Sequence, residues 1–133
     1  MLTDSTVSII SSATTLATAT AATYTPELNL QSAVGGAVVL NFQFATAPTA
    51  DKTLDVYLLP TLTSGSGYDV YTQGYNILLG SAKVAAVTTA QQITIPLDPS
   101  KLNAKYAKIA IYNNATGQTV TFNSVQVNIR KVS

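Results

Sequence analysis

The side chains of this sequence most able to do chemistry are its six carboxylates. They are Asp4, Glu27, Asp51, Asp55, Asp69 and Asp98. A glycosidase needs two carboxyl groups about 5 to 10 Å apart, one of them as the acid. No two of the six form a recognisable motif, and most fall in expected turns, where an Asp commonly caps or shapes the backbone. We expect no catalytic residue, although a hydrolase stays open as a third class of function.

Other reactive groups are scarce. The 133-residue chain has no histidine and no cysteine, which excludes disulfides, cysteine zinc sites and the commonest general base. Ser81 and Lys83 lack the Ser-x-x-Lys helical spacing of a serine–lysine pair. Gly35-Gly36 and Gly65-Ser66-Gly67 lack the Lys-Ser/Thr of a phosphate loop and are expected to form turns. The sequence therefore predicts no cofactor and no metal site.

Tyrosine is the most suggestive residue type. Tyr68, Tyr71 and Tyr75 fall in an expected long surface loop that ends near Gly74, and tyrosine offers a large contact area to proteins and sugars. We name these three as candidate contact residues. The other tyrosines considered are equally explained as cover for sheet faces: Tyr57, Tyr106 and Tyr112. Asn114-Ala115-Thr116 matches a glycosylation triplet, but we favour a turn there.

The overall composition limits the possible partners. With seven Lys and Arg against six Asp and Glu, the net charge is +1, and only 10% of residues are charged. This balance gives no basic surface for nucleic acid. No apolar run approaches the roughly 20 residues that span a bilayer, so we expect no membrane contact and a soluble single domain.

Residues 1–26 differ from the rest because they are rich in Ala, Thr and Ser. We predict an extended N-terminal arm here, followed by a single domain at residues 27–133. The arm starts Met1-Leu2-Thr3-Asp4, without the basic start of a secretory signal, so we expect it to be retained. Its Ala/Thr alternation fits a strand, and a flexible tail is equally open. The candidate contact residues of the arm are Thr14, Leu16, Thr18 and Thr20.

Alternating apolar residues predict several strands. Val38, Leu40, Phe42 and Phe44 alternate with other residues, so the even positions should face inward. Further strands are expected from residue 54, with Pro60 at a strand end or on an edge strand, and at residues 77–87, 92–97, 107–112 and from 120. Asp98-Pro99-Ser100-Lys101 predicts a single helical turn with an Asp cap.

The last expected strand changes its apolar parity. Val120 and Phe122 are even, whereas the apolar residues from Val125 onward are odd. A bulge near Asn123-Ser124 would restore one inward face; two strands, or one strand crossing between sheets, are the alternatives. Asn113 to Gly117 is the best candidate for a hairpin turn. Together these elements predict an all-β fold, an antiparallel β-sandwich of jelly-roll or immunoglobulin-like type.

Two stretches carry a resemblance to a known family. The first is Leu54-Asp55-Val56-Tyr57-Leu58-Leu59-Pro60, followed by the Gly-rich loop with Tyr68-Asp69. The second is Ile95-Pro96-Leu97-Asp98-Pro99-Ser100-Lys101, which leads to the strand at residues 108–112 and the turn at 113–117. In order, they cover about residues 54–117 and resemble small structural proteins of tailed bacteriophages that decorate the head.

The resemblance implies a non-enzymatic virion protein that decorates or cements the head shell. Its partners would be the major capsid protein or other virion proteins and copies of itself, with a trimer as the expected oligomer. Its location would be the virion, assembled in the host cytoplasm. From the residues, we expect the arm or a sheet edge to pair with a neighbouring subunit. The alternative function is a tail-fibre or adhesive module that binds carbohydrate through Tyr68, Tyr71 and Tyr75.

Overall fold

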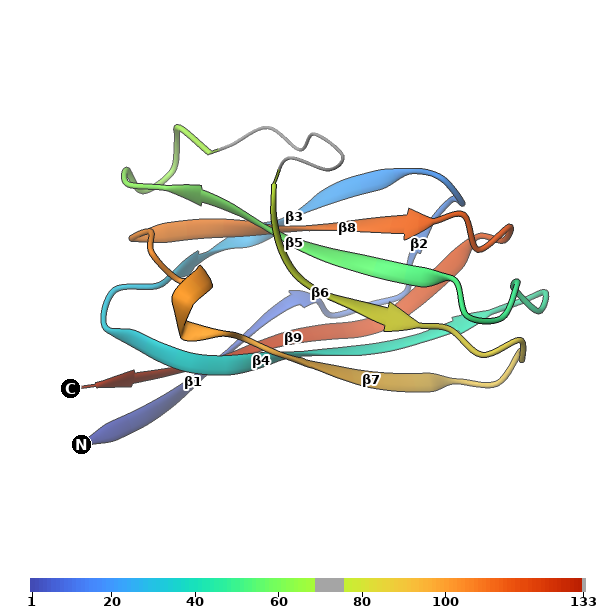
Figure 1. The fold of residues 1–133 in the computed structure, drawn as a ribbon, viewed down its shortest axis with the longest axis horizontal. Helices are drawn as coiled ribbons and strands as arrows, with labels where there is room; N and C mark the ends of the chain where they lie inside the picture. Colours follow the sequence, from blue (N-terminus) through green and yellow to red (C-terminus); the bar gives the residue numbers. More distant parts are fainter. Residues whose placement is uncertain (69–75, 133) are drawn as a thin grey trace.

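The chain forms two antiparallel β-sheets packed face to face, shown in a computed structural model that describes residues 1–68 and 76–132 (Figure 1). The elements, in chain order, are β1 (Leu2–Ile10), β2 (Thr14–Leu16), β3 (Ala21–Asn29), β4 (Ala33–Phe44), β5 (Thr53–Thr61), β6 (Ile77–Lys83), β7 (Gln91–Pro96), the short 3-10 turn η1 (Pro99–Lys101), β8 (Tyr106–Asn114) and β9 (Val120–Val132). The expected all-β sandwich is confirmed.

The strand order identifies the type of sandwich. Sheet A has the order β1-β9-β4-β7, and sheet B has the order β3-β8-β5-β6. The short strand β2 also pairs with β9, beyond the part of β9 that pairs with β1. If β1 and β2 are counted as one edge, each sheet has four strands, and the chain crosses repeatedly between the sheets. This is the arrangement of a jelly roll, the first of the two expected types.

The core lies between the sheets and follows the predicted alternation. Val38, Leu40, Phe42 and Phe44 of β4 are fully buried, as their even positions predicted. The ring of Phe42 packs edge to face against Phe44 at 6.0 Å between ring centroids, and against Phe122 of β9 at 6.5 Å. Edge-to-face contacts add to the stabilisation from apolar burial, so this aromatic group ties β4 to β9.

The parity change in the last strand is a β-bulge, as predicted. Asn41 lies opposite Ser124 and Phe42 lies opposite Phe122, so Asn123 is the additional residue. The bulge allows both Phe122 and Val125 to point into the core, where each is fully buried.

Close backbone contact between β4 and β9 requires a glycine at position 36. Gly36 has φ of +145°, and a Cβ atom there would lie 1.9 Å from the carbonyl oxygen of Asn128. Leu97 N–H also donates to the Gly36 carbonyl at 2.9 Å. Only a residue without a side chain fits at this position.

The structure corrects the expected separation of residues 1–26 from the domain. β1 and β2 pair with β9 in sheet A, and β3 continues across residue 26 while pairing with β8 in sheet B. Ile9, Ile10 and Leu16 belong to the common core. The segment is low in hydrophobicity, but its few large apolar residues lie where the sandwich can bury them. It is therefore a part of the sandwich, in the strand conformation that its alternation allowed.

The turn after β8 also differs from expectation. β8 belongs to sheet B and β9 to sheet A, so residues 113–117 connect two sheets and form no hairpin. Asn113 is fully buried and its Nδ2 donates to the carbonyls of Leu16 (3.0 Å) and Gln118 (2.9 Å). Its Oδ1 accepts from Thr116 Oγ1 at 2.6 Å. Turn residues favour a reversal of the chain but do not specify which sheet follows, which explains the incorrect prediction.

Two smaller predictions are confirmed. Asp98 caps η1 by accepting a hydrogen bond from Ser100 N–H at 3.0 Å. Pro60 lies near the end of β5, beyond Leu58, where the pairing with β6 stops. Its lack of an N–H group therefore costs no hydrogen bond to β6.

Candidate functional site

The N-terminal candidate contact residues make their contacts within the chain. Leu16 is only 6% exposed and lies in the core, so its side chain is not on the surface as expected. Thr18 Oγ1 accepts a hydrogen bond from Gly117 N–H at 3.0 Å. The hydroxyls of Thr14 and Thr20 donate to nearby carbonyls, those of Ser12 and Ala17 respectively. The Thr18 bond, together with the bond from Asn113 to Leu16, holds this segment against the turn that follows β8.

Of the three candidate loop tyrosines, Tyr68 is described, and Tyr71 and Tyr75 lie outside the described residues. The Tyr68 hydroxyl donates to Glu27 of β3, and the ammonium of Lys108 lies 4.5 Å from the centroid of its ring. The ring is half-buried, with a cation over one face. Tyr68 therefore anchors the start of the loop to the surface of sheet B.

Glu27 is the acceptor at the centre of this anchor. It accepts hydrogen bonds from Ser64 Oγ at 2.6 Å and from Gly65 N–H at 2.9 Å. These two bonds, with a smaller contribution from the charge of Lys108, lower the pKa of the Glu27 carboxyl below its usual value of 4.5. The carboxylate is therefore the stable form at neutral pH, and it holds the loop to β3.

A buried carboxylate on the outer face of sheet B was missed from the sequence. Asp55 of β5 is 6% exposed, and its Oδ1 accepts from Thr53 Oγ1 and Ser81 Oγ, each at 2.7 Å. Its Oδ2 accepts from Asn114 Nδ2 at 2.9 Å. The signal in the sequence was an Asp within the apolar strand Leu54-Asp55-Val56. Because a buried charge is costly unless it is hydrogen-bonded, these donors explain how Asp55 is accommodated.

The Asp55 cluster also clarifies two motifs of the sequence. Ser81 donates its hydroxyl to Asp55, so this serine has a structural hydrogen bond. Asn114, the asparagine of the glycosylation triplet, is held by the same carboxylate on the sheet. Both side chains therefore support the packing of β5 against its neighbours β6 and β8.

The remaining described carboxylates lie on separate elements. Asp4 Oδ1 of β1 pairs with Arg130 Nε of β9 at 3.1 Å, and Asp98 caps η1. Asp51 lies in the connection before β5 with φ of +65°. Within residues 1–68 and 76–132, no group of three His, Cys, Asp or Glu residues is placed to hold a metal ion.

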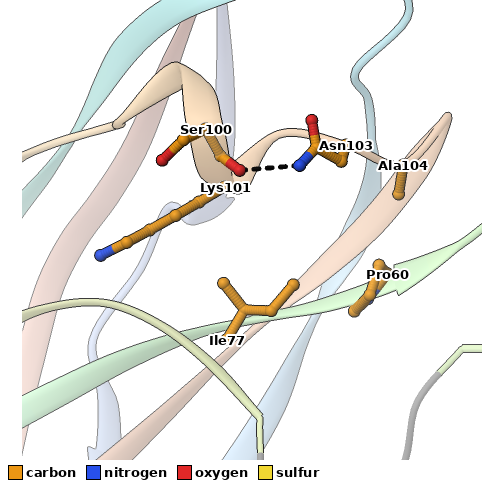
Figure 2. A pocket seen from close by; sticks show the side chains of 6 residues that line it. All are labelled: Pro60, Ile77, Ser100, Lys101, Asn103 and Ala104. Carbon is orange, nitrogen blue, oxygen red and sulfur yellow. Dashed lines mark hydrogen bonds between the residues drawn. The ribbon is translucent and has the colours of Figure 1, made fainter.

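A half-open pocket of about 330 Å³ lies between η1 and the strands of sheet B (Figure 2). It is lined by Pro60, Ile77, Ser100, Lys101, Asn103 and Ala104. Lys101 Nζ donates to the carbonyl of Leu78 at 2.8 Å, and Asn103 Nδ2 donates to the carbonyl of Ser100 at 2.8 Å. The side chains of Lys101 and Asn103 thus each donate a hydrogen bond to the protein's own backbone. Specific recognition of a small molecule needs polar groups that converge on the ligand, and the described walls do not offer such a set.

The outer edge of β1 is the surface feature with a clear binding capacity. β1 is nine residues long and keeps a regular register with β9 from Leu2 to Ser8. Every residue from Leu2 to Thr6 is exposed, on both faces of the strand. Its single charge, Asp4, is paired with Arg130, and it contains no Pro, Lys or Gly. An edge of this kind presents unpaired backbone groups that can add another strand.

The other three edges carry features that discourage strand addition. β3 contains Pro26, and its pairing with β8 is irregular between Tyr24 and Leu28. β6 has a register shift against β5 and ends in Lys83. β7 is six residues long and ends in Pro96. Prolines, bulges, lysines and short length are the devices by which proteins protect sheet edges. Among the described strands, β1 is a long edge without proline or lysine, and its one register shift lies near its end, between Ser8 and Ile10.

Comparisons with known proteins support the fold. No protein-family model and no curated protein matches this sequence. A CBM4 structure is 12% identical, with 80% of this chain and 60% of the other covered and a TM-score of 0.53. A structure of infectious bursal disease virus, Gx strain, is 12% identical, with 98% and 32% covered and a TM-score of 0.50. The cleaved adhesin domain K3 of Lys-gingipain from Porphyromonas gingivalis W83 is 20% identical, with 77% and 60% covered and a TM-score of 0.46.

The two similarities with a TM-score of 0.50 or more support the β-sandwich fold and no more. The chain spans about 60% of the length of the CBM4 structure and of the Lys-gingipain K3 domain. The described residues contain no helix with the length and apolar character needed for a membrane crossing.

Proposed function

We propose that this chain is a non-enzymatic virion structural protein that decorates or cements the head shell of a tailed bacteriophage. The observation that carries the proposal is the long exposed edge of β1, whose register is regular from Leu2 to Ser8. The β-sandwich fold, in which the chain is similar to a structure of infectious bursal disease virus with a TM-score of 0.50, is consistent with a role in a particle. In this role the chain binds the major capsid protein, other virion proteins or copies of itself.

Strand addition suits this role for a physical reason. The new contacts are hydrogen bonds between backbone groups, and they do not depend on a charged surface. The chain has a net charge of +1, and Asp4, the one charge of β1, is already neutralised by Arg130. Attachment through this edge should therefore change little with salt concentration, in contrast to attachment through charged patches.

The test is to locate the chain on a particle. Particles from the cells that produce this protein would be purified, analysed by mass spectrometry and imaged by electron cryomicroscopy. We expect the chain in the particle fraction and its sandwich on the outside of the head. Absence from purified particles would overturn the proposal, and density on a tail fibre would favour the second candidate below.

A variant links the location to the edge. Ser5→Lys places a charge in the middle of exposed β1, and should reduce recovery of the chain with particles at least tenfold, equivalent to about 1.4 kcal/mol. Gln92→Lys makes a similar change on exposed β7 and should bind as the unaltered chain does. Equal loss with both variants would show that general surface charge, and not the β1 edge, controls attachment.

The second candidate is an adhesive module that binds carbohydrate. The observation that favours it is the similarity in fold to the CBM4 structure, whose TM-score is 0.53. Tyr68 is the described member of its candidate tyrosines. A glycan array with the purified chain, repeated with Tyr68→Ala, tests this function. Binding that the substitution weakens would favour the adhesive module.

A further inference from the structure

We propose that β1 pairs antiparallel with β1 of a second copy of this chain, about a two-fold axis at Ser5. The two copies of sheet A then form one continuous sheet across the axis. This inference rests on the proposed function, because it names the partner of the β1 edge. It predicts a dimer in place of the expected trimer, because antiparallel pairing of one edge with itself closes after two copies.

The regular part of β1 determines how much of the edge is available. Pairing with β9 is continuous from Leu2 to Ser8, and the register shifts at Ile9. A two-fold axis at Ser5 places Leu2 opposite Ser8 of the second copy, so the whole regular stretch is paired. An axis at Thr6 would place Ile9 and the bulge within the new ladder, and an irregular strand pairs poorly.

Charge selects among the remaining registers. Residues that lie opposite each other in an antiparallel pair share one face. The axis of a symmetric pair must therefore lie midway between the two copies of one residue. An axis at Asp4 would bring the two Asp4 carboxylates directly opposite each other, which is unfavourable. With the axis at Ser5, each Asp4 lies opposite Thr6, whose hydroxyl can donate to the carboxylate. The Asp4 to Arg130 pair of each copy can remain intact.

The side chains on the other face of the strand also match. Thr3, Ser5 and Val7 share this face, because their partners on β9 are Lys131, Ile129 and Val127. In the proposed register the two Ser5 hydroxyls meet at the axis, and Thr3 lies opposite Val7. Hydroxyl pairs and β-branched pairs across strands are both stabilising. The exposed part of β1 is therefore self-complementary on both of its faces.

The absence of cysteine in the sequence permits a direct test. Ser5→Cys places the two new thiols opposite each other at the axis, at about 4.5 to 5.5 Å between Cβ atoms, close to the range that disulfides bridge. Mild oxidation should convert most of this variant to a covalent dimer. Thr94→Cys, on the exposed edge strand β7, is the matched control and should remain a single chain.

Sedimentation equilibrium of the unaltered chain should give twice the mass of one chain. Ser5→Lys should reduce the measured mass to that of one chain, because two lysines would face each other at the axis. Gln92→Lys should leave the dimer unchanged. A single-chain mass for the unaltered protein, or equal cross-linking of the Ser5→Cys and Thr94→Cys variants, would overturn the two-fold pairing.

The same experiments separate this inference from the proposed function. If the chain is found on particles but Ser5→Cys does not cross-link, the pairing is wrong and the virion role stands. If Ser5→Cys cross-links but the chain is absent from particles, the pairing stands and the virion role is wrong.

Discussion

Asn113 shows how much of this fold depends on single polar side chains in apolar surroundings. Its side chain reaches Leu16, Thr116 and Gln118, which belong to the N-terminal segment and to the turn before β9. Its backbone N–H and carbonyl also bond to residues 20 and 19. Because Asn113 is fully buried, a substitution that shortens its side chain would remove three hydrogen bonds that water cannot easily replace.

Asn113→Ala should therefore lower the free energy of unfolding by about 2 to 4 kcal/mol. The substitution leaves the buried carbonyl of Leu16 and the part-buried carbonyl of Gln118 without this donor. Urea unfolding followed by circular dichroism measures the loss. Asn103→Ala, which removes one hydrogen bond at an exposed position, is the control and should change stability by about 0.5 kcal/mol or less. Equal effects of the two substitutions would contradict the role assigned to Asn113.

Because of Tyr24, the free energy of unfolding should fall at alkaline pH. Its hydroxyl is buried without a hydrogen-bond partner among the described residues, and burial raises its pKa from 10.0 to about 12. Below pH 10 the group is protonated in both the folded and unfolded states, so it adds no pH dependence. Between pH 10 and 12 the unfolded chain loses the proton more readily, and stability should fall by about 1 to 2 kcal/mol, reduced from the full value because the ring is partly exposed.

Urea unfolding at pH 8 and pH 11.5 measures this fall, and Tyr24→Phe should remove it. At pH 8 the same substitution should leave stability unchanged or raise it slightly, because it removes an unpaired buried hydroxyl. Tyr106→Phe is the control for loss of a bonded hydroxyl, since the Tyr106 oxygen accepts a hydrogen bond from Gln31. An alkaline fall that persists in full after Tyr24→Phe would assign the effect to another group.

At the scale of the elements, the close approach of β4 and β9 is the contact on which sheet A depends. β9 lies between β1 and β4, and Gly36 permits the backbones of β4 and β9 to meet near Asn128. The aromatic contacts of Phe42 join the same two strands further along. A side chain at position 36 would have to separate the two strands, which would also weaken the packing beneath them.

Gly36→Ala should therefore destabilise the fold by at least about 3 kcal/mol, or prevent folding. Gly35→Ala is a closely matched control, because Gly35 has φ of +156° and an added Cβ there would lie 3.9 Å from its nearest neighbour, the Leu97 oxygen. The backbone strain is similar for the two residues, so the difference measures the steric clash. Thermal unfolding of both variants gives this difference. Similar losses would show that backbone strain, and not the clash, dominates.

At the scale of the whole molecule, the sequence predicts strands well and their partners poorly. β4 and β9 bury one face, so alternation and the parity change near Asn123 were visible locally. Asp98 and Pro99 marked η1 through cap chemistry that acts over a few residues. The residues of the turn after β8 predict a hairpin, and this prediction is wrong. The sheet that the next strand joins depends on distant strands, which the turn residues do not specify. Asp55 was missed because its donors come from three separate elements.

The N-terminal segment is where the structure differs most from the expectation, and this difference changes the experiment that tests its role. Deletion of residues 1–26 removes β1, β2 and most of β3, and exposes the sides of β8 and β9. The truncated chain should be unfolded or insoluble, as measured by circular dichroism and by recovery of soluble protein. A folded truncated chain would show that these strands are dispensable. Binding tests therefore need point substitutions in β1 instead.

Leu16→Ala tests the same conclusion within the intact chain. Because Leu16 is buried in the core, its truncation should cost about 2 to 5 kcal/mol. Thr15→Ala alters its exposed neighbour and should cost about 0.5 kcal/mol or less. A small effect of Leu16→Ala would indicate that residues 14–16 contribute little to the core.

The position of β9 has a consequence for the order in which the molecule folds. Residues 120–132 are made after the other described strands, yet β1, β2 and β4 all pair with them. Until β9 is made, β1 and β2 lack their partner in sheet A, and β4 lacks one of its two neighbours. Such distant pairing makes folding slow, on the order of milliseconds to seconds, and leaves time for aggregation. Residues 1–26 are rich in Ala, Thr and Ser, so this segment exposes little hydrophobic surface before β9 is made, which limits aggregation.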